Sequence, residues 1–235
     1  MFLAKLSSIT SALLIAGGLG AGGYFIGHGI SHRNDSSRGI SVKGLSEKEV
    51  PASVAIWMIA YSSTGNDLAE INGKLANSTE AVRDFLKSSG FDEKDIAIQP
   101  PLVRDLSLNE RDKDAEPLIA RYSATQSVLL RTSKVDLVKP AVAAVSKLIA
   151  AGVELSGRNE PDYSFDRINE IKPEMIAEAT KNARIAAEQF SRDAATQLGG
   201  LRSAQQGWFQ VESRDVATPE RKIVRVVVEV EFEVK

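Results

Sequence analysis

The chain has 235 residues, of which 43% are hydrophobic and 26% are charged, a composition typical of a folded globular protein. This length allows one domain with extensions or two small domains. Cysteine is absent and the two histidines are His28 and His32, which excludes disulfides, thiol catalysis, Cys/His zinc sites and a Ser-His-Asp triad in the folded part. The net charge of −2 shows no basic excess, so we expect no nucleic-acid partner.

The N-terminal segment carries a long apolar run. Residues 6–27 are 22 consecutive uncharged residues, enough to cross a bilayer as a helix, and Tyr24 and Phe25 suit a membrane interface. We therefore expect residues 1–30 to form one retained transmembrane helix in the inner (cytoplasmic) membrane. The polar residues 31–39 would form a tether, and residues 40–235 a domain in the periplasm.

A cleaved export signal is the alternative for this segment. Cleavage at Gly20-Ala21-Gly22 would leave a mature N-terminus near Gly23 and a soluble periplasmic protein. The run is longer than a usual signal core, so we favour retention. Charge alone leaves the membrane orientation open, because Lys5 precedes the apolar run and Arg33 and Arg38 follow it, so both flanks carry positive charge.

Glycines in the same segment follow small-xxx-small spacing. Gly18 and Gly22, and again Gly23 and Gly27, would let two membrane helices approach backbone to backbone. A glycine-rich stretch without a partner has the same pattern, so self-association through the anchor is one of two interpretations.

The domain begins near Ile40, and its first signals are a strand and a helix. Residues 52–62 are apolar on both alternating faces, which predicts a strand in the middle of a sheet, beginning near Pro51. Asn66 or Asp67 can cap a helix that ends at Gly90. Its inward face comprises apolar residues at helical spacing: Leu68, Ile71, Leu75, Val82, Phe85 and Leu86.

A hairpin is predicted next. Residues 95–106 form a strand interrupted by Pro100 and Pro101, which cannot donate to a sheet and so belong at an edge or bulge. Residues 104–117 form a polar loop at the hairpin tip. Residues 118–130 alternate in polarity, which predicts a half-buried antiparallel strand.

The second helix is expected to start with Asp136 as N-cap, to place Pro140 in its first turn, and to end at Gly152. Its inward residues would be Leu137, Ala141, Ala144, Val145, Leu148 and Ile149. A strand over residues 153–165 should follow.

The longest helix has Pro173 in its first turn, after a separate turn over residues 167–172, and stops at Gly199-Gly200. Its apolar stripe is rich in alanine, which allows close packing within the chain or against a partner helix: Ile176, Ala179, Ala183, Ala186, Ala187, Phe190, Ala194 and Leu198.

Two strands close the chain, residues 201–213 and 221–235, joined by a turn around Pro219. The fold class is therefore α+β, with a mostly antiparallel sheet. The first six elements match a ferredoxin-like split βαβ unit, to which the long Ala-rich helix and the C-terminal strand pair are added.

Several segments of residues 40–235 resemble the SIMPL-domain family of bacterial envelope proteins, often labelled as oxidative stress defence proteins. They are VKGLSEKEV, YSATQSVLLRT at 122–132, DYSFDRINEIKPEMIAEATKNARIAAEQF at 162–190, LGGLRSAQQGWF, and the terminal Val-rich strand. The resemblance implies an exported domain, ring-like or channel-like homo-oligomers and no agreed enzymatic activity. It supplies no catalytic residues.

The strongest candidates for chemistry are Glu160, Asp162 and Asp166 around Tyr163. Paired carboxylates could act as acid and base or bind a divalent cation. Acids at a strand end and helix start also serve as caps, and we favour that structural interpretation.

Other polar groups have simpler explanations. His28 and His32 are too few for a metal site at a membrane exit, and GGLGAGG lacks the sequel of a phosphate-binding loop. Asn77-Ser78-Thr79 has the form of a glycosylation acceptor but lies in a predicted helix. Three acids of the polar loop, Asp112, Asp114 and Glu116, are solvating charges.

We therefore expect no catalytic residues, no cofactor and no metal site. The favoured function is a membrane-anchored, extracytoplasmic binding or scaffold protein that self-associates, in envelope or oxidative stress defence, with an unidentified small-molecule ligand if any. A carboxylate-dependent envelope enzyme and a signal-cleaved soluble periplasmic oligomer are the alternatives.

Overall fold

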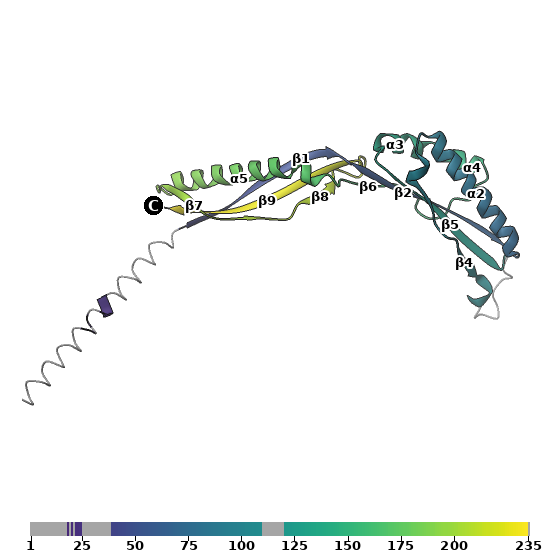
Figure 1. Cartoon of the computed structure of the whole chain (residues 1–235), viewed down its shortest axis with the longest axis horizontal. Coiled ribbons are helices and arrows are strands. Elements are labelled where there is room, and N and C mark those ends of the chain that lie inside the picture. The colour runs from purple at the N-terminus through teal and green to yellow at the C-terminus, as the bar shows by residue number, and fades with distance from the viewer. Residues whose placement is uncertain (1–17, 19, 21, 25–38, 110–119, 235) are drawn as a thin grey trace, which may run out of the picture. The chain divides into compact units, whose positions relative to one another are not determined.

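The computed structural model describes residues 18, 20, 22–24, 39–109 and 120–234 (Figure 1). The two histidines, the three acids of the polar loop and most of the expected anchor and tether lie outside these residues. None of the helices in the described ranges is long and apolar enough to cross a membrane. The described residues divide into two compact units: unit 1 comprises those up to Ser46, Glu174–Phe209 and 226–234, and unit 2 comprises those of 47–173 and Gln210–Arg225.

Unit 2 is built on an antiparallel sheet with the order β3-β5-β2-β6, and β4 also pairs with β5. The strands are β2 (Val54–Gly65), β3 (Ile96–Ile98), β4 (Leu102–Asp105), β5 (Tyr122–Thr132) and β6 (Asp162–Ser164). With β3 and β4 counted as one interrupted strand, the order is second-third-first-fourth along the chain, which confirms the predicted split βαβ arrangement. Pro100 and Pro101 separate β3 from β4 at the sheet edge, as expected.

Helices α2 (Leu68–Ser88), α3 (Val135–Ala143) and α4 (Ser146–Ala150) pack on one face of this sheet (Figure 1). Asp67 caps α2 as predicted, because its Oδ1 accepts the N–H of Ala69 at 2.6 Å. At the other end Gly90 has a φ of +95°, and the N–H of Phe91 donates to the carbonyl of Leu86 at 3.2 Å. The predicted start and stop of this helix are confirmed.

The strand β2 is interior, as predicted, but it is buried on one face only. Trp57 and Ile59 are fully buried, whereas Met58 between them is 50% exposed. The helices of unit 2 cover a single face of the sheet, so the other face of β2 meets solvent. The neighbouring β5 is half-buried as expected, with Val128 and Leu130 inside.

The second helical region differs from the prediction. Instead of one helix from Asp136 to Gly152, the chain forms α3 and α4. Lys134 takes the N-cap position, so Asp136 lies in the first turn and Pro140 falls inside α3, where it removes one N–H from the helical ladder. The last turn of α3 tightens, since the N–H of Ala144 donates to the carbonyl of Ala141 at 3.0 Å.

Fewer of the predicted inward residues of these two helices are buried than expected. Ala141 and Leu148 are buried as predicted, but Leu137 is 37% exposed and Ile149 is 61% exposed. The break between the helices rotates the second one, so a single 3.6-residue stripe does not continue through both.

The predicted strand over residues 153–165 is confirmed only in part, as the strand Asp162–Ser164 and an isolated antiparallel bridge between Leu155 and Tyr61 of β2. Around Leu155 the backbone still bonds to β2, since the N–H of Ser156 donates to the carbonyl of Ala60 at 2.9 Å. Between this bridge and β6, Asn159 supplies the hydrogen bonds to β2. Asn159 Oδ1 accepts the N–H of Ala60 at 2.7 Å, and the Asn159 carbonyl accepts the Nε1–H of Trp57 at 2.9 Å. This segment is therefore fixed to β2 without being a strand.

The second sheet has the order β1-β9-β7, and β8 also pairs with β9. Its strands are β1 (Gly39–Pro51), β7 (Leu198–Gln206), β8 (Gln210–Ser213) and β9 (Arg221–Val234). The expected single sheet is thus two sheets, although the α+β class is confirmed. The period-two pattern of the last strand is confirmed by the buried residues Val224, Val226, Val228, Val230 and Phe232.

Two features of this sheet were not predicted, the strand β1 and the division of the strand expected over residues 201–213. β1 has no counterpart in the predicted elements, because its inward positions include the small residues Gly44 and Ser46, which give no apolar alternation. The expected strand over residues 201–213 is divided between β7 and β8 by Gly207-Trp208-Phe209.

The Ala-rich helix α5 (Ile168–Asp193) is confirmed, and it lies along β1 and β9 in unit 1 (Figure 1). The separate turn over residues 167–172 is wrong, since the helix already begins at Ile168. It ends before Gly199-Gly200, and Phe190 of the predicted stripe is 59% exposed. Its buried residues recur every four positions: Met175, Ala179, Ala183, Ala187 and Ser191.

Within unit 1, α5 approaches β1 closely. A Cβ on Gly44 would lie 1.9 Å from the carbonyl oxygen of Ala179 and 2.8 Å from the Cβ of Ala183. Beside this contact, Ser46 Oγ donates to Glu178 Oε2 at 2.6 Å. The small residues of the helix therefore pack against the chain's own sheet.

Candidate ligand-binding groove

The predicted carboxylates do not form one cluster. Glu160 Oε2 accepts Nε–H of Arg158 at 2.7 Å, which makes an exposed local ion pair. Asp166 accepts the Ser53 hydroxyl at 2.5 Å, and its own N–H donates back to that oxygen at 2.8 Å. In the part of the chain that the structure describes, no three His, Cys, Asp or Glu side chains could share a metal ion.

Glu160 and Asp162 nevertheless line one groove of about 660 Å³ in unit 2, from which Asp166 is absent. One wall comes from β6 and the residues before it: Arg158, Glu160, Pro161, Asp162 and Tyr163. A second wall comes from Lys139 and Val142 of α3. The third comes from β8, β9 and their connecting loop: Ser213, Asp215, Val216, Ala217, Pro219, Glu220 and Lys222.

The connecting loop is fixed by a carboxylate at its centre. Asp215 forms an ion pair with Arg214 at 2.9 Å and accepts the N–H and hydroxyl of Thr218 at 2.7 and 2.8 Å. Arg214 first, then Thr218, lowers the pKa of Asp215 to about 2. These contacts favour the ionised form, so they weaken only as pH falls towards that value.

A buried lysine lies at the base of this wall. Lys222 is 7% exposed, and its Nζ donates to Ser213 Oγ, its cross-strand partner, at 2.8 Å. Burial lowers the pKa of Lys222, and the charge of Asp162 acts in the opposite direction. The site thus pairs a partly desolvated ammonium group with a hydroxyl.

The remaining cations of the groove are already paired. Lys139 Nζ lies 3.2 Å from Glu220 Oε1, as Arg158 lies beside Glu160. Tyr163 contributes a half-buried ring, and burial followed by the charge of Glu220 raises the pKa of its hydroxyl, which stays neutral at pH 7. The groove therefore offers an apolar surface and one hydrogen-bonding cation.

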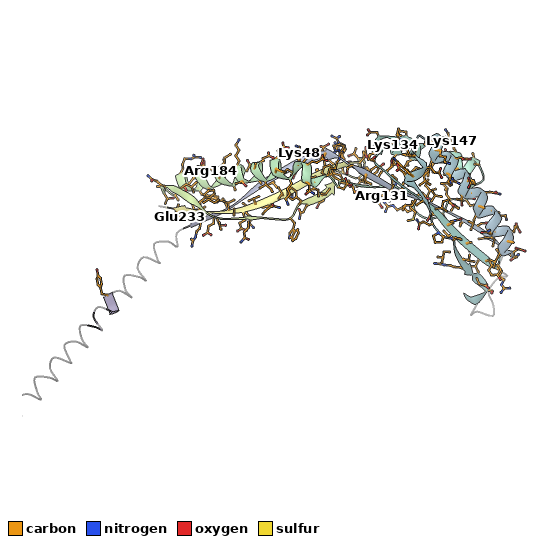
Figure 2. The ribbon with its side chains drawn as sticks, viewed as in Figure 1. Lys48, Arg131, Lys134, Lys147, Arg184 and Glu233 are labelled. Carbon is orange, nitrogen blue, oxygen red and sulfur yellow. The ribbon has the colours of Figure 1, made fainter. Side chains whose placement is uncertain are left out.

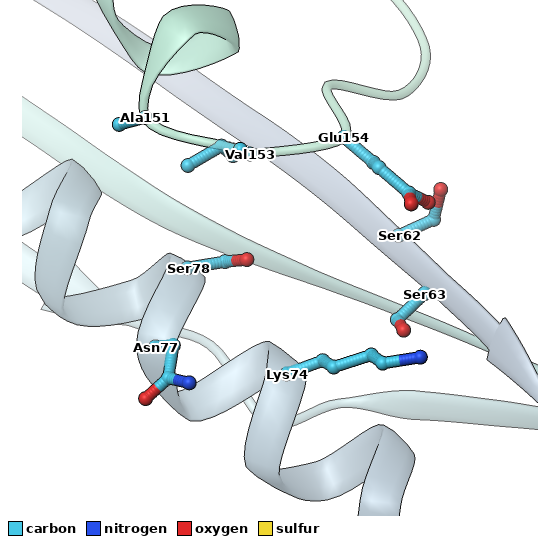
Figure 3. A pocket seen from close by; sticks show the side chains of 9 residues that line it. Ser62, Ser63, Lys74, Asn77, Ser78, Ala151, Val153 and Glu154 are labelled. Atoms are coloured by element: carbon cyan, nitrogen blue, oxygen red, sulfur yellow. The ribbon is translucent and has the colours of Figure 1, made fainter.

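A second cavity of about 240 Å³ lies between α2, β2 and residues 151–154 (Figure 3). Lys74 points across it, but Glu70 holds this lysine at 2.7 Å and raises its pKa. Asn77 and Ser78 also line the cavity, whereas Thr79 is buried and shares a 2.6 Å hydrogen bond with the Tyr61 hydroxyl. The glycosylation-like motif thus lies inside α2, as predicted, and the cavity is the weaker candidate.

Sequence reasoning placed Glu160, Asp162 and Tyr163 together but missed the lysine and serine that complete the groove. Ser213 and Lys222 lie on strands about fifty residues further along the chain than these three residues. The pairing of β8 with β9 brings Ser213 and Lys222 side by side. A signal existed in Lys222 itself, which occupies an inward position of the alternating β9 pattern.

The family model described as "SIMPL: Protein of unknown function (DUF541)" matches residues 40–232. No curated protein matches the chain. The match covers most of the sequence and begins where the domain was expected to begin, so the chain belongs to the SIMPL family.

Proposed function

We propose that this protein works by contact and not by bond-making, as a membrane-tethered, extracytoplasmic scaffold or binding module that self-associates through the edge strand β7. A role in envelope or oxidative stress defence fits such a module. The observation that carries the proposal is the exposure of β7 and of the residues just after it.

β7 is an open sheet edge. Its neighbour in the described sheet is β9, and the exposed residues include Leu201 at 60% and, two residues past its end, Trp208 at 93%. An exposed edge strand presents unpaired N–H and carbonyl groups to another strand. A second copy offers the same edge, so two β7 strands can pair across a two-fold axis.

The opposite edge, β1, is protected by charge, whereas β7 is not. β1 carries Lys43, Glu47, Lys48 and Glu49. β7 contains no lysine, acid or proline, and its one arginine, Arg202, already pairs with Glu231 at 3.2 Å. Lysines and prolines are among the usual devices that block edge pairing. β7 lacks both, and beyond its register shifts at Leu198–Ser203 it pairs regularly with β9 from Ser203 to Gln206, so β7 is the favoured interface.

Lysines on the β7 edge should prevent assembly. We expect Leu201→Lys/Trp208→Lys to sediment as a single chain under conditions in which the wild type forms a larger species, because like charges would face each other across the interface. Sedimentation velocity measures this. The matched control Leu102→Lys/Ile149→Lys adds the same charge at exposed apolar positions of unit 2 and should assemble normally. An assembled β7 variant would refute the interface.

Retention of residues 6–27 makes a separate prediction. Native protein should fractionate with membranes and have the intact mass of the uncleaved chain, because a helix of this length and hydropathy partitions into the bilayer. Fractionation followed by intact-mass spectrometry measures both. A soluble species with its N-terminus near Gly23 would instead establish the signal-cleaved alternative.

The carboxylate-dependent enzyme has less support. Glu160 and Asp166 are engaged by Arg158 and Ser53, so they serve as structural partners. The triple change Glu160→Gln/Asp162→Asn/Asp166→Asn separates the two hypotheses, since a contact module keeps its oligomer size and an enzyme of this kind loses all turnover.

A further inference from the structure

Lys222 lines the groove, and no carboxylate of the described residues contacts its ammonium group. Its Nζ has three donor protons, and the one hydrogen bond it makes to the described residues goes to the neutral Ser213 hydroxyl at 2.8 Å. At 7% exposure, a cation is costly unless an anion or further acceptors compensate it. The free donor protons and the groove it lines therefore favour an incoming anionic oxygen.

Ser213 adds a second donor at the same point. Its Oγ accepts from Lys222, so the hydroxyl proton remains available, and the described residues provide no other acceptor for it. An oxygen placed between the two groups would accept one ammonium proton and one hydroxyl proton. Charge-assisted hydrogen bonds of this kind are the strong ones.

The other charges of the groove restrict the ligand to a single negative charge. Lys139 is paired with Glu220, and Arg158 with Glu160, so neither cation is free for a ligand. Asp162 lies near enough for its charge to act on Lys222 and would repel a second negative charge. A carboxylate fits this balance better than a phosphate dianion.

Asp215, a further carboxylate of the lining, is paired with Arg214 at 2.9 Å, and the remaining lining residues are apolar. Val142, Pro161, Tyr163, Ala217 and Pro219 come from all three walls. A volume of about 660 Å³ is within the usual range for small-molecule sites, in which a largely apolar lining holds the body and a few polar groups fix its orientation.

We propose that this groove binds a small monocarboxylate with an apolar or aromatic body, its carboxylate held by Lys222 and Ser213 and its body lying against Tyr163. The site lies in unit 2 and the proposed β7 interface in unit 1, so each proposal can fail without the other.

Calorimetry of the full chain in lipid nanodiscs, against empty nanodiscs, tests the site with 4-phenylbutyrate as the probe. We expect binding of this carboxylate, and weaker binding of its neutral amide, of acetate and of phenyl phosphate. The assembly variant Leu201→Lys/Trp208→Lys should bind the probe normally, which keeps this result separate from self-association.

Variants assign the binding to the two named groups. Lys222→Met should weaken phenylbutyrate about tenfold or more, and Ser213→Ala several-fold, because each removes a donor to the carboxylate. Lys147→Met is the matched control, since this exposed lysine of α4 (Figure 2) is not among the residues that line the groove.

Four results would overturn the proposal: no heat above that of empty nanodiscs, equal binding of the amide, tighter binding of phenyl phosphate, or unchanged affinity in Lys222→Met. If circular dichroism shows that Lys222→Met is unfolded, Ser213→Ala decides, and unchanged affinity in that variant overturns the proposal equally.

Discussion

Gly44→Val should unfold unit 1 at physiological temperature. The new side chain would enter the contact between β1 and α5, where even a Cβ lies 1.9 Å from the carbonyl oxygen of Ala179 and 2.5 Å from the nitrogen of Ala183. Both are backbone atoms of a helix, so no rotamer change relieves the overlap. Overpacking of this kind costs about 3 kcal/mol or more.

Thermal denaturation followed by circular dichroism measures the effect. Gly73→Ala is the matched control, because nothing lies within 4 Å of a Cβ at this exposed position of α2. Alanine there should stabilise the protein by about 1 kcal/mol through helix propensity. Equal melting curves for Gly44→Val and Gly73→Ala would show that α5 does not press on Gly44.

Trp57→Ala should have a comparable effect on unit 2. Trp57 is fully buried in β2, its Nε1–H donates to the Asn159 carbonyl at 2.9 Å, and its ring meets that of Phe85 edge-on at 6.3 Å. Truncation leaves a cavity and an unpaired carbonyl. The expected loss is about 3–5 kcal/mol of unfolding free energy.

Urea denaturation followed by far-ultraviolet circular dichroism measures this loss. The chain's other tryptophan, Trp208, is 93% exposed, and Trp208→Ala should change the free energy by less than about 0.5 kcal/mol. In Trp208→Ala the remaining tryptophan fluorescence comes from the buried Trp57. It should be blue-shifted and protected from quenching by acrylamide. An unchanged urea midpoint in Trp57→Ala would contradict the packing of unit 2.

The elements that were predicted well are those whose local chemistry agrees with their packing. α2 has an Asp cap, a regular apolar stripe and a glycine with positive φ at its end, so all of its signals coincide. β9 alternates strictly, because α5 covers one face of its sheet. Pro100 and Pro101 predict a sheet edge because proline cannot donate to a ladder, and in the structure they lie between β3 and β4 at that edge.

The elements that were missed depend on partners distant in the chain. β1 is recognisable only with α5 in place, since Gly44 is selected by the helix that touches it. The segment before β6 was predicted as a strand, but its backbone pairs with β2 as an isolated bridge at Leu155, and the side chain of Asn159 supplies a further hydrogen bond to β2. The strand or helix propensity of a segment depends on its own residues and therefore indicates neither of these long-range contacts.

The candidate groove illustrates the same limit. Glu160 and Asp162 are close in the sequence and could be predicted as a group, but the residues that surround them in the groove come from distant parts of the chain. Arg158 pairs with Glu160, whereas the charge of Asp162 acts on Lys222, a residue of β9. The spacing of the acids along the chain therefore identified part of the groove lining but not Lys222, the buried cation that lines the same groove.

Light scattering of the full wild-type chain in detergent, with the detergent mass subtracted, tests self-association most directly. We predict a protein mass at a whole-number multiple of 25.4 kDa that falls to this single-chain value in Leu201→Lys/Trp208→Lys. A wild-type mass of 25.4 kDa across the accessible concentration range would contradict the proposal that the protein works as a self-associating module.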